Sequence, residues 1–187
     1  WVLRKAVKFA YENLREIPCG VSINISVQSL NSGVIIKFLQ EALCEFPINP
    51  AQIALEITEH SLIDNFENSQ NLIRNLKTLG FNISLDDFGT RYSSLNYLSK
   101  MAFDCLKIDK SYVDNIATFD KDSLIIEQII KLAAKLGIKT VAEGIETEMQ
   151  ERILQKLGCD YGQGYYFARP MDKTDILSMV TRDIEFL

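Results

Sequence analysis

The sequence has few of the residues that mark specialised classes of protein. It contains one histidine, 4 cysteines, 4 prolines and 9 glycines in 187 residues. The cysteines are far apart and form no Cys-x-x-Cys pair, which argues against a zinc ribbon or a redox motif. So little proline and glycine excludes collagen-like and low-complexity chains. We therefore expect a globular protein with four reduced, mostly buried thiols.

Long apolar runs and excess positive charge are also missing. No apolar run approaches the length of a transmembrane helix, and no signal-peptide pattern opens the chain, so we expect a cytoplasmic domain, even if a longer protein is membrane-anchored. The net charge of -5 argues against DNA, RNA or an anionic membrane as the main partner. An acidic surface still permits a small phosphate ligand, because it can hold the divalent cations that bridge to phosphates.

What the chain does contain is a regular alternation of strand-like and helical segments. With 47% apolar residues and no polar linker, it is predicted to be a single domain spanning 1–187. The pattern predicts strands at 20–27, 53–58, 81–85, 105–108, 138–142 and 161–167, with helices at 2–14, 34–46, 67–79, 123–136, 148–157 and from 174 onward. Such alternation predicts a parallel sheet with right-handed crossovers, either an open doubly wound sheet or a barrel.

The barrel is the favoured alternative. No GxGxxG or GxxxxGK[ST] motif follows the first strand, which weakens the Rossmann and P-loop options. A complete eight-unit barrel needs about 250 residues. Because the chain begins with Trp1 in a helix that is already under way, we expect a piece of a longer protein. The predicted fold is an α/β, TIM-like (β/α) barrel, N-terminally truncated, with about six of eight strands present.

Polar residues fall near the end of every predicted strand. They are Asn24, Glu56, Asp86 with Asp87, Lys107, Glu143 and Gln163. In a barrel these ends converge on one face, where the active sites of this fold are built. Carboxylates gathered there repel one another unless a cation lies among them, and oxygen ligands favour Mg²⁺ or Mn²⁺. The alternative, that each group caps a helix or forms an isolated salt bridge, explains one position better than six in register.

Hydrolysis without a catalytic histidine is feasible at such a site. A metal lowers the pKa of bound water, and a carboxylate can take the proton. The only histidine, His60, is predicted to lie in a loop and to be solvated. Paired metals of this kind are typical of phosphoryl transfer.

Six segments carry a resemblance to a known family. They are Ser22-Ile23-Asn24-Ile25-Ser26, Leu55-Glu56-Ile57-Thr58-Glu59, Leu85-Asp86-Asp87-Phe88-Gly89-Thr90, Leu106-Lys107-Ile108-Asp109, Val141-Ala142-Glu143-Gly144-Ile145-Glu146-Thr147 and Gly162-Gln163-Gly164-Tyr165. Together they resemble the EAL domain family of cyclic-di-GMP phosphodiesterases, in order and spacing, from Trp1 to about Pro170. The resemblance implies a bacterial TIM-like barrel that hydrolyses cyclic di-GMP to linear pGpG with Mg²⁺ or Mn²⁺, two ions in all.

The resemblance also implies a role for individual residues. The positions matching the family's metal ligands are Asn24, Glu56, Asp86 and Asp87. Glu143 matches a general base or second-metal ligand, and Lys107 matches the lysine that holds the attacking water. Gln163 matches a glutamine near the metals, Glu59 an acid that anchors the loop after Asp86-Asp87, and Glu146 a supporting acid. For Glu59 and Glu146, a plain surface carboxylate is an almost equal alternative.

Two positions depart from the family pattern. The Glu-Ala-Leu signature, whose glutamate is a metal ligand, is expected before the opening helix. The letters Glu41-Ala42-Leu43 lie in a later predicted helix and are a coincidence. Arg91 stands where the family usually has glycine, and is expected to alter the motion of its loop or to reach a phosphate.

Three functions remain open at this point. The first is a cyclic-di-GMP phosphodiesterase, expected to form a homodimer through this domain and to be fused to sensory or GGDEF domains. The second is a degenerate module that binds cyclic di-GMP or a partner protein without turnover. An unrelated TIM-barrel hydrolase is the third and least favoured. Retention of the matched acids and of Lys107 favours the enzyme.

Overall fold

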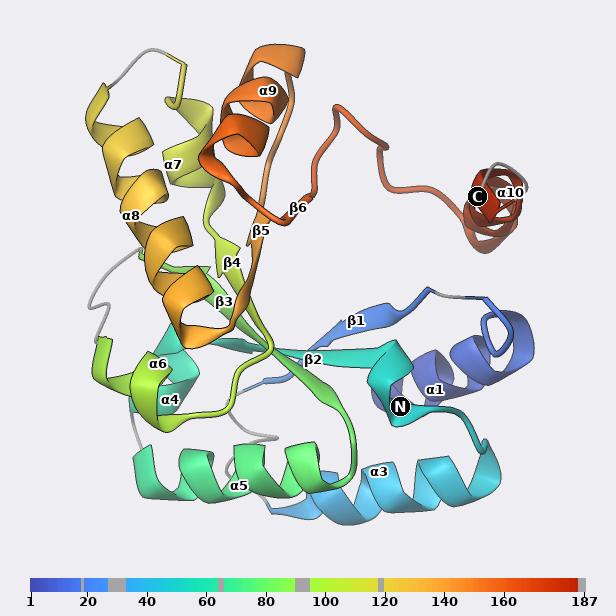
Figure 1. Ribbon diagram of the computed structural model, residues 1–187. Coiled ribbons are helices and arrows are strands. Elements are labelled where there is room, and N and C mark those ends of the chain that lie inside the picture. Colours follow the sequence, from blue (N-terminus) through green and yellow to red (C-terminus); the bar gives the residue numbers. More distant parts are fainter. Residues whose placement is uncertain (18, 27–32, 64–65, 90–94, 118–119, 185–187) are drawn as a thin grey trace.

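The computed structural model describes residues 1–17, 19–26, 33–63, 66–89, 95–117 and 120–184 (Figure 1). Its centre is one parallel sheet whose strand order follows the sequence. The strands are β1 (Val21–Asn24), β2 (Ile53–Thr58), β3 (Asn82–Phe88), β4 (Cys105–Ile108), β5 (Lys139–Ala142) and β6 (Tyr161–Gly162). Among the described residues, β1 and β6 are the two edges of this half-barrel. The predicted α/β barrel-type fold is confirmed.

Helices cover the outer face of the sheet. The longer ones are α1 (Val2–Asn13), α3 (Val34–Glu45), α5 (Phe66–Thr78), α8 (Asp120–Leu136), α9 (Glu148–Leu157) and α10 (Lys173–Ile184). Short turns of helix lie at η1 (Pro50–Gln52), α4 (Glu59–Ile63), α6 (Leu95–Lys100) and α7 (Lys110–Asp114). Helix α5 packs on β3 and α8 on β5. The last helix, α10, lies apart from β6 and near α1, where the Lys173 ammonium is 5.4 Å from the Phe9 ring centroid (Figure 1).

The two faces of the sheet differ in chemistry. Side chains alternate along a strand, and those facing the helices are apolar: Ile53, Leu55 and Ile57 of β2 are completely buried. The other face lines a cavity of about 380 Å³. Its lining is Ser22, Ala54, Glu56, Asn82, Ser84, Asp104, Cys105, Lys107, Lys139, Val141, Tyr161 and Gln163. The polar residues at the strand ends are therefore the last members of a largely polar inner row, not exceptions in otherwise apolar strands.

Most predicted boundaries agree with the structure, and the disagreements have local causes. The strands at 53–58 and 105–108 and the helix at 148–157 are confirmed. β3 extends through Phe88, so the acid pair lies inside the strand rather than after it. β6 stops at Gly162 instead of 167, because the chain turns there: the N–H of Tyr166 donates to Ile145 O and that of Phe167 to Gly164 O.

His60, the helix after β4 and the cysteines each differ in part from what the sequence predicted. His60 is exposed as expected, but it lies in α4 and not in a loop. Helix α7 was not predicted; its N-cap is Asp109, whose carboxylate accepts the N–H of Ser111. The four cysteines are unpaired, yet Cys44 is exposed and the others are only partly buried, so the expectation of mostly buried thiols was wrong. No helix among the described residues is both long and apolar enough to cross a bilayer.

Candidate active site at the carboxyl ends of the strands

Lys107 lies at the centre of the polar cluster. Its ammonium is 2.7 Å from Glu143 Oε1, 3.0 Å from Glu56 Oε2 and 3.2 Å from Asp86 Oδ1. These three carboxylates come from just after β5, from β2 and from β3, so the ladder of parallel strands brings them together. An ammonium has three N–H donors, and each carboxylate can take one.

Burial gives this arrangement its electrostatic character. The residue Lys107 is 6% exposed, and burial alone would lower the pKa of its ammonium. Glu143 and Glu56 outweigh that effect and hold the pKa of Lys107 above its usual value. Lys107 therefore stays charged across the physiological range and is fixed in place by its partners.

An irregularity in β3 places two consecutive carboxylates on one side of the strand. Leu85 pairs with Leu106, and Phe88 pairs with Ile108, so β3 has one residue more than β4 between these points. Such a bulge breaks the strict alternation of side chains. At the bulge Asp87 adopts a φ of +56°, a backbone conformation that aspartate tolerates better than most residues. The N–H of Asp87 donates to Asp86 Oδ1 at 3.0 Å.

The bulge creates a set of oxygen ligands. One carboxylate oxygen from each of Asp86, Asp87 and Glu143 lies within 4.8 Å of the other two. Asp87 is exposed, but partial desolvation of its carboxylate, together with the charges of Asp86 and Asp109, raises its pKa. Burial also raises the pKa of Glu143, even though Lys107 opposes it. Crowded carboxylates of this kind fit a divalent cation that prefers hard oxygen ligands, such as Mg²⁺ or Mn²⁺.

The other predicted site residues lie around this cluster at different distances. Asn24 is the exposed last residue of β1 and pairs in register with Glu56. Gln163 lines the same cavity as Glu56 and Lys107. Glu59 begins α4 and is buried. Arg91 lies outside the described residues.

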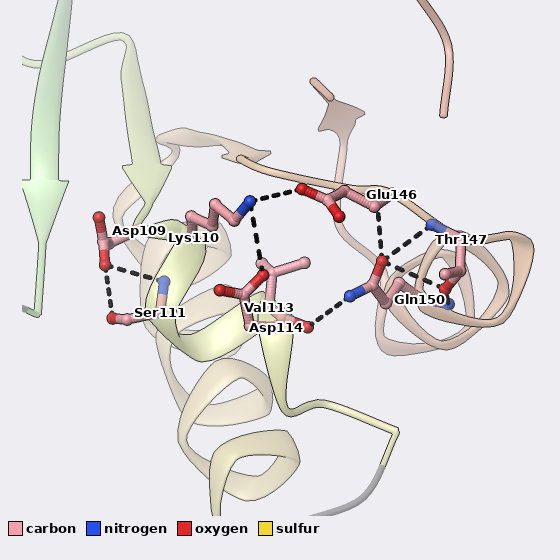
Figure 2. Close-up of polar contacts among 8 residues, drawn as sticks. All are labelled: Asp109, Lys110, Ser111, Val113, Asp114, Glu146, Thr147 and Gln150. Carbon is pink, nitrogen blue, oxygen red and sulfur yellow. Dashed lines mark hydrogen bonds and ion pairs between the residues drawn. The ribbon is translucent and has the colours of Figure 1, made fainter. Parts of the chain in front are cut away.

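Glu146 is not part of the cluster. Its carboxylate is exposed and forms an ion pair with Lys110 at 2.5 Å (Figure 2). Hydrogen bonding from Lys110 lowers the pKa of Glu146. The two acids for which a surface role was an alternative thus differ: Glu59 is buried, whereas Glu146 is at the surface.

Two residues that bind the segments next to the cluster, Tyr112 and Gln150, were not predicted from the sequence. The hydroxyl of Tyr112 in α7 donates to Gly89 O at 2.6 Å, just after the acid pair, and no sequence signal indicated it. Gln150 links α9 to the segment after Glu143 and to α7 (Figure 2). The spacing Thr147-x-x-Gln150 is that of a capping box, so part of the role of Gln150 was visible in the sequence.

Comparison with known proteins agrees with this geometry. The model of the EAL domain family matches residues 1–170. The chain belongs to the EAL domain family. Among curated EAL relatives, the cyclic di-GMP phosphodiesterase RocR of Pseudomonas aeruginosa is 36% identical over 161 residues, which is 86% of this chain and 41% of RocR. The probable cyclic di-GMP phosphodiesterase PdeB of Escherichia coli is 41% identical over 157 residues, 84% of this chain and 30% of PdeB.

Solved EAL structures match in fold as well as in sequence. The PaMucR phosphodiesterase in complex with c-di-GMP superposes with a TM-score of 0.89 at 32% identity, over 94% of this chain and 72% of the other. The manganese/cy-diGMP complex of Klebsiella pneumoniae BlrP1 has a TM-score of 0.80 at 30% identity, over 89% of this chain and 43% of that one. The chain spans less than half the length of either curated relative, RocR or PdeB.

Proposed function

We propose that this EAL domain hydrolyses cyclic di-GMP to linear pGpG, and that two Mg²⁺ or Mn²⁺ ions assist the reaction. The observation that carries the proposal is the contact between Lys107 and Glu143, at 2.7 Å, beside the paired carboxylates of Asp86 and Asp87. A cluster with a fixed ammonium, a carboxylate of raised pKa and a set of oxygen ligands has the parts that phosphodiester hydrolysis requires. Relatives that are cyclic di-GMP phosphodiesterases support the choice of substrate.

Each side chain has a distinct task in this scheme. Asp86, Asp87, Glu56 and Asn24 hold the cations, which when bound neutralise phosphate charge and lower the pKa of water. Lys107 would hold the attacking water beside Glu143 through an N–H donor that Glu56 or Asp86 gives up when its carboxylate turns to a cation. The Glu143 carboxylate takes a proton from that water as the water oxygen bonds to phosphorus. One P–O bond of the ring breaks, and the leaving oxygen takes a proton from solvent. Burial raises the pKa of Glu143, which is the direction that general-base catalysis requires.

A non-catalytic binding module is the second candidate. It is favoured by one observation: β1 and β6 are unpaired edges within the described sheet, and the cavity on its inner face lies beside them. A binding module, however, has no use for a buried ammonium in contact with a carboxylate of raised pKa. We therefore place hydrolysis first.

The decisive experiment measures binding and turnover separately. pGpG production is followed by chromatography with Mn²⁺ present, and binding of cyclic di-GMP by calorimetry. The proteins are this chain and a fusion in which the segment that the family pattern places before the opening helix, with its Glu-Ala-Leu, precedes Trp1. We expect turnover at least in the fusion, because the added segment supplies a further carboxylate and pairs a sheet edge. A fusion that binds the nucleotide but makes no pGpG contradicts hydrolysis and supports the binding module.

The same assay tests the role of Glu143. Glu143→Gln keeps the shape of the side chain but removes the proton acceptor, so turnover should fall by at least ~100-fold while binding changes little. Glu148→Gln, an exposed position in α9, is the matched control and should behave like the wild type. Equal losses of turnover and binding in Glu143→Gln would assign Glu143 to binding alone.

The wider setting is proposed from the relatives. MucR of Pseudomonas aeruginosa is a bifunctional diguanylate cyclase/cyclic di-GMP phosphodiesterase, and the chain covers 23% of it. By analogy, the domain acts in the cytoplasm as a homodimer, fused to GGDEF or sensory domains, with cyclic di-GMP rather than DNA or RNA as its ligand. Light scattering of the purified chain at micromolar concentration tests the dimer.

A further inference from the structure

Gln150 makes more hydrogen bonds than its place in a helix requires (Figure 2). It is 7% exposed, and its Oε1 accepts the N–H groups of Glu146 and Thr147, both at 2.9 Å. The N–H of Gln150 in turn donates to Thr147 Oγ1 at 3.3 Å, which completes a capping box. A capping box needs only the bond from Thr147. The bond from Glu146 is an addition.

The other end of the same amide reaches a different element. Gln150 Nε2 donates to Val113 O, in α7, at 3.1 Å. Helix α7 begins three residues after Lys107, and Glu146 lies three residues after Glu143. One buried side chain therefore joins the segment that follows Glu143 to the helix that follows Lys107. Figure 2 shows its bonds to Glu146 and Val113.

A second contact between these segments is weaker. Lys110 Nζ binds the carboxylate of Glu146, and the stem of Lys110 packs against Gly144, where an added Cβ would lie 2.4 Å from Lys110 Cγ. Gly144 has a φ of +71°, so this close approach needs glycine. The ion pair itself is about half exposed, and exposed pairs restrain little. Hydrogen bonds in a buried environment are stronger, which makes the bonds of Gln150 the stronger of these two side-chain connections.

We infer that Gln150 is a positioning residue that holds Glu143 at its place against Lys107. The inference rests on the proposed hydrolysis, in which these two side chains flank the attacking water. Small displacements of catalytic groups reduce turnover strongly, by up to about 100-fold for 1 Å. A glutamate at this position could still complete the capping box. It has no donor for Val113 O, so it separates capping from the connection to α7.

The test compares three variants, each made in whichever of the two proteins above, the chain or the fusion, hydrolyses cyclic di-GMP. Gln150→Glu keeps the cap and loses the bond to Val113 O, Gln150→Ala loses both, and Gln155→Glu is an exposed control in the same helix with the same change of charge. We expect Gln150→Glu to lower kcat by at least ~10-fold with KM nearly unchanged. Amide exchange at Glu146 and Thr147 should stay slow in Gln150→Glu and become fast in Gln150→Ala. Gln155→Glu should match the wild type throughout.

A measurement without turnover separates this inference from the proposed function. The NMR signal of the Lys107 side-chain ammonium reports its contact with Glu143, and it should change in Gln150→Glu but not in Gln155→Glu. Wild-type kcat in Gln150→Glu, or a loss confined to Gln150→Ala, overturns the inference, because the cap alone would then matter. If the wild type makes no pGpG while the Lys107 signal still responds to Gln150→Glu, the proposed hydrolysis fails and the connection stands. If the Lys107 signal is unchanged in Gln150→Glu, the inference that Gln150 positions Glu143 is wrong.

Discussion

Carboxylates lie at both ends of the strands, but they are held in opposite ways. At the amino ends, Asp104 precedes β4 and accepts the N–H of Ile83 at 2.7 Å while binding Lys77. Asp160 precedes β6 and does the same with the N–H of Thr140, at 2.9 Å, and with Lys139. Each of these aspartates thus joins a neighbouring strand to a lysine.

The pKa shifts differ between the two ends: the pKa of Asp160, at the amino ends, is lowered, whereas those of Asp87 and Glu143, at the carboxyl ends, are raised. Burial would raise the pKa of Asp160, but Lys139 and Thr140 outweigh it and lower that pKa. For Asp87 and Glu143 the pKa is raised, because burial and neighbouring carboxylates exceed what Lys107 offsets. The aspartates at the amino ends therefore stabilise the fold. The carboxylates at the carboxyl ends have too few positively charged partners, and this arrangement fits a cation.

Removing divalent cations should have the largest effect and should act on the carboxyl end alone. In excess EDTA we expect turnover to be lost, and to return with Mg²⁺ or Mn²⁺, because the clustered carboxylates need cations to neutralise their negative charge. Ca²⁺, which is larger and less strict in geometry, should restore turnover poorly. Thermal unfolding should show a higher Tm with Mn²⁺ than in EDTA, because a cation that binds only the folded state stabilises it. Full turnover in EDTA contradicts the comparison.

Asp104→Ala should reveal the structural role of the amino end. The change leaves the buried N–H of Ile83 without its acceptor and Lys77 without its partner, so we expect a loss of about 1–3 kcal/mol in the free energy of unfolding. Urea titration measures it, and turnover at low temperature should persist. The control is Glu127→Ala, whose ion pair with Lys131 is exposed and lacks a backbone N–H, with an expected loss below about 0.5 kcal/mol. Similar losses for both would mean that the backbone bond adds nothing.

Asp87→Asn should have a smaller effect of the opposite sign. Asparagine also tolerates a positive φ, and it removes a carboxylate whose charge is disfavoured where it lies. Because Asp87 is exposed to solvent, which screens the repulsion, the gain in EDTA should be only a few tenths of a kcal/mol. Urea titration in EDTA and in Mn²⁺ should show that the variant has lost most of its stabilisation by the metal. If Asp87→Asn is less stable than the wild type in EDTA, the repulsion between Asp87 and its neighbouring carboxylates is already relieved in the wild type.

Acid unfolding gives the smallest effect. A carboxyl whose pKa is lowered in the folded state stabilises the protein above its unfolded pKa and loses that contribution as the pH falls through the folded value. For Asp160 this window lies below about pH 4. Asp160→Asn should therefore flatten the fall in stability in this window, which urea titrations between pH 5 and pH 2 can measure. An unchanged slope would mean that solvent screens the Lys139 pair.

The sequence allowed the framework to be predicted, because its signals are local. Apolar runs marked β2 and β4, and Gly158 marked the end of α9, where the structure places it at the C-cap in the left-handed conformation. The convergence of Glu56, Lys107 and Glu143 followed from parallel topology alone. What escaped prediction depends on a shift of one residue or on distant contacts. The bulge at Asp87 and the bond from Gln150 to Val113 have no signature of their own in the residue pattern.

The extra residue in β3 also has a genetic consequence. Without Asp87, the ladder could run from Leu85 to Phe88 with the same spacing as its partner between Leu106 and Ile108, and the strand would pair more regularly than it does. Loss of a single codon would thus abolish the second carboxylate while leaving every other strand in register. One in-frame deletion would therefore leave the half-barrel with a single carboxylate where the proposed hydrolysis requires two.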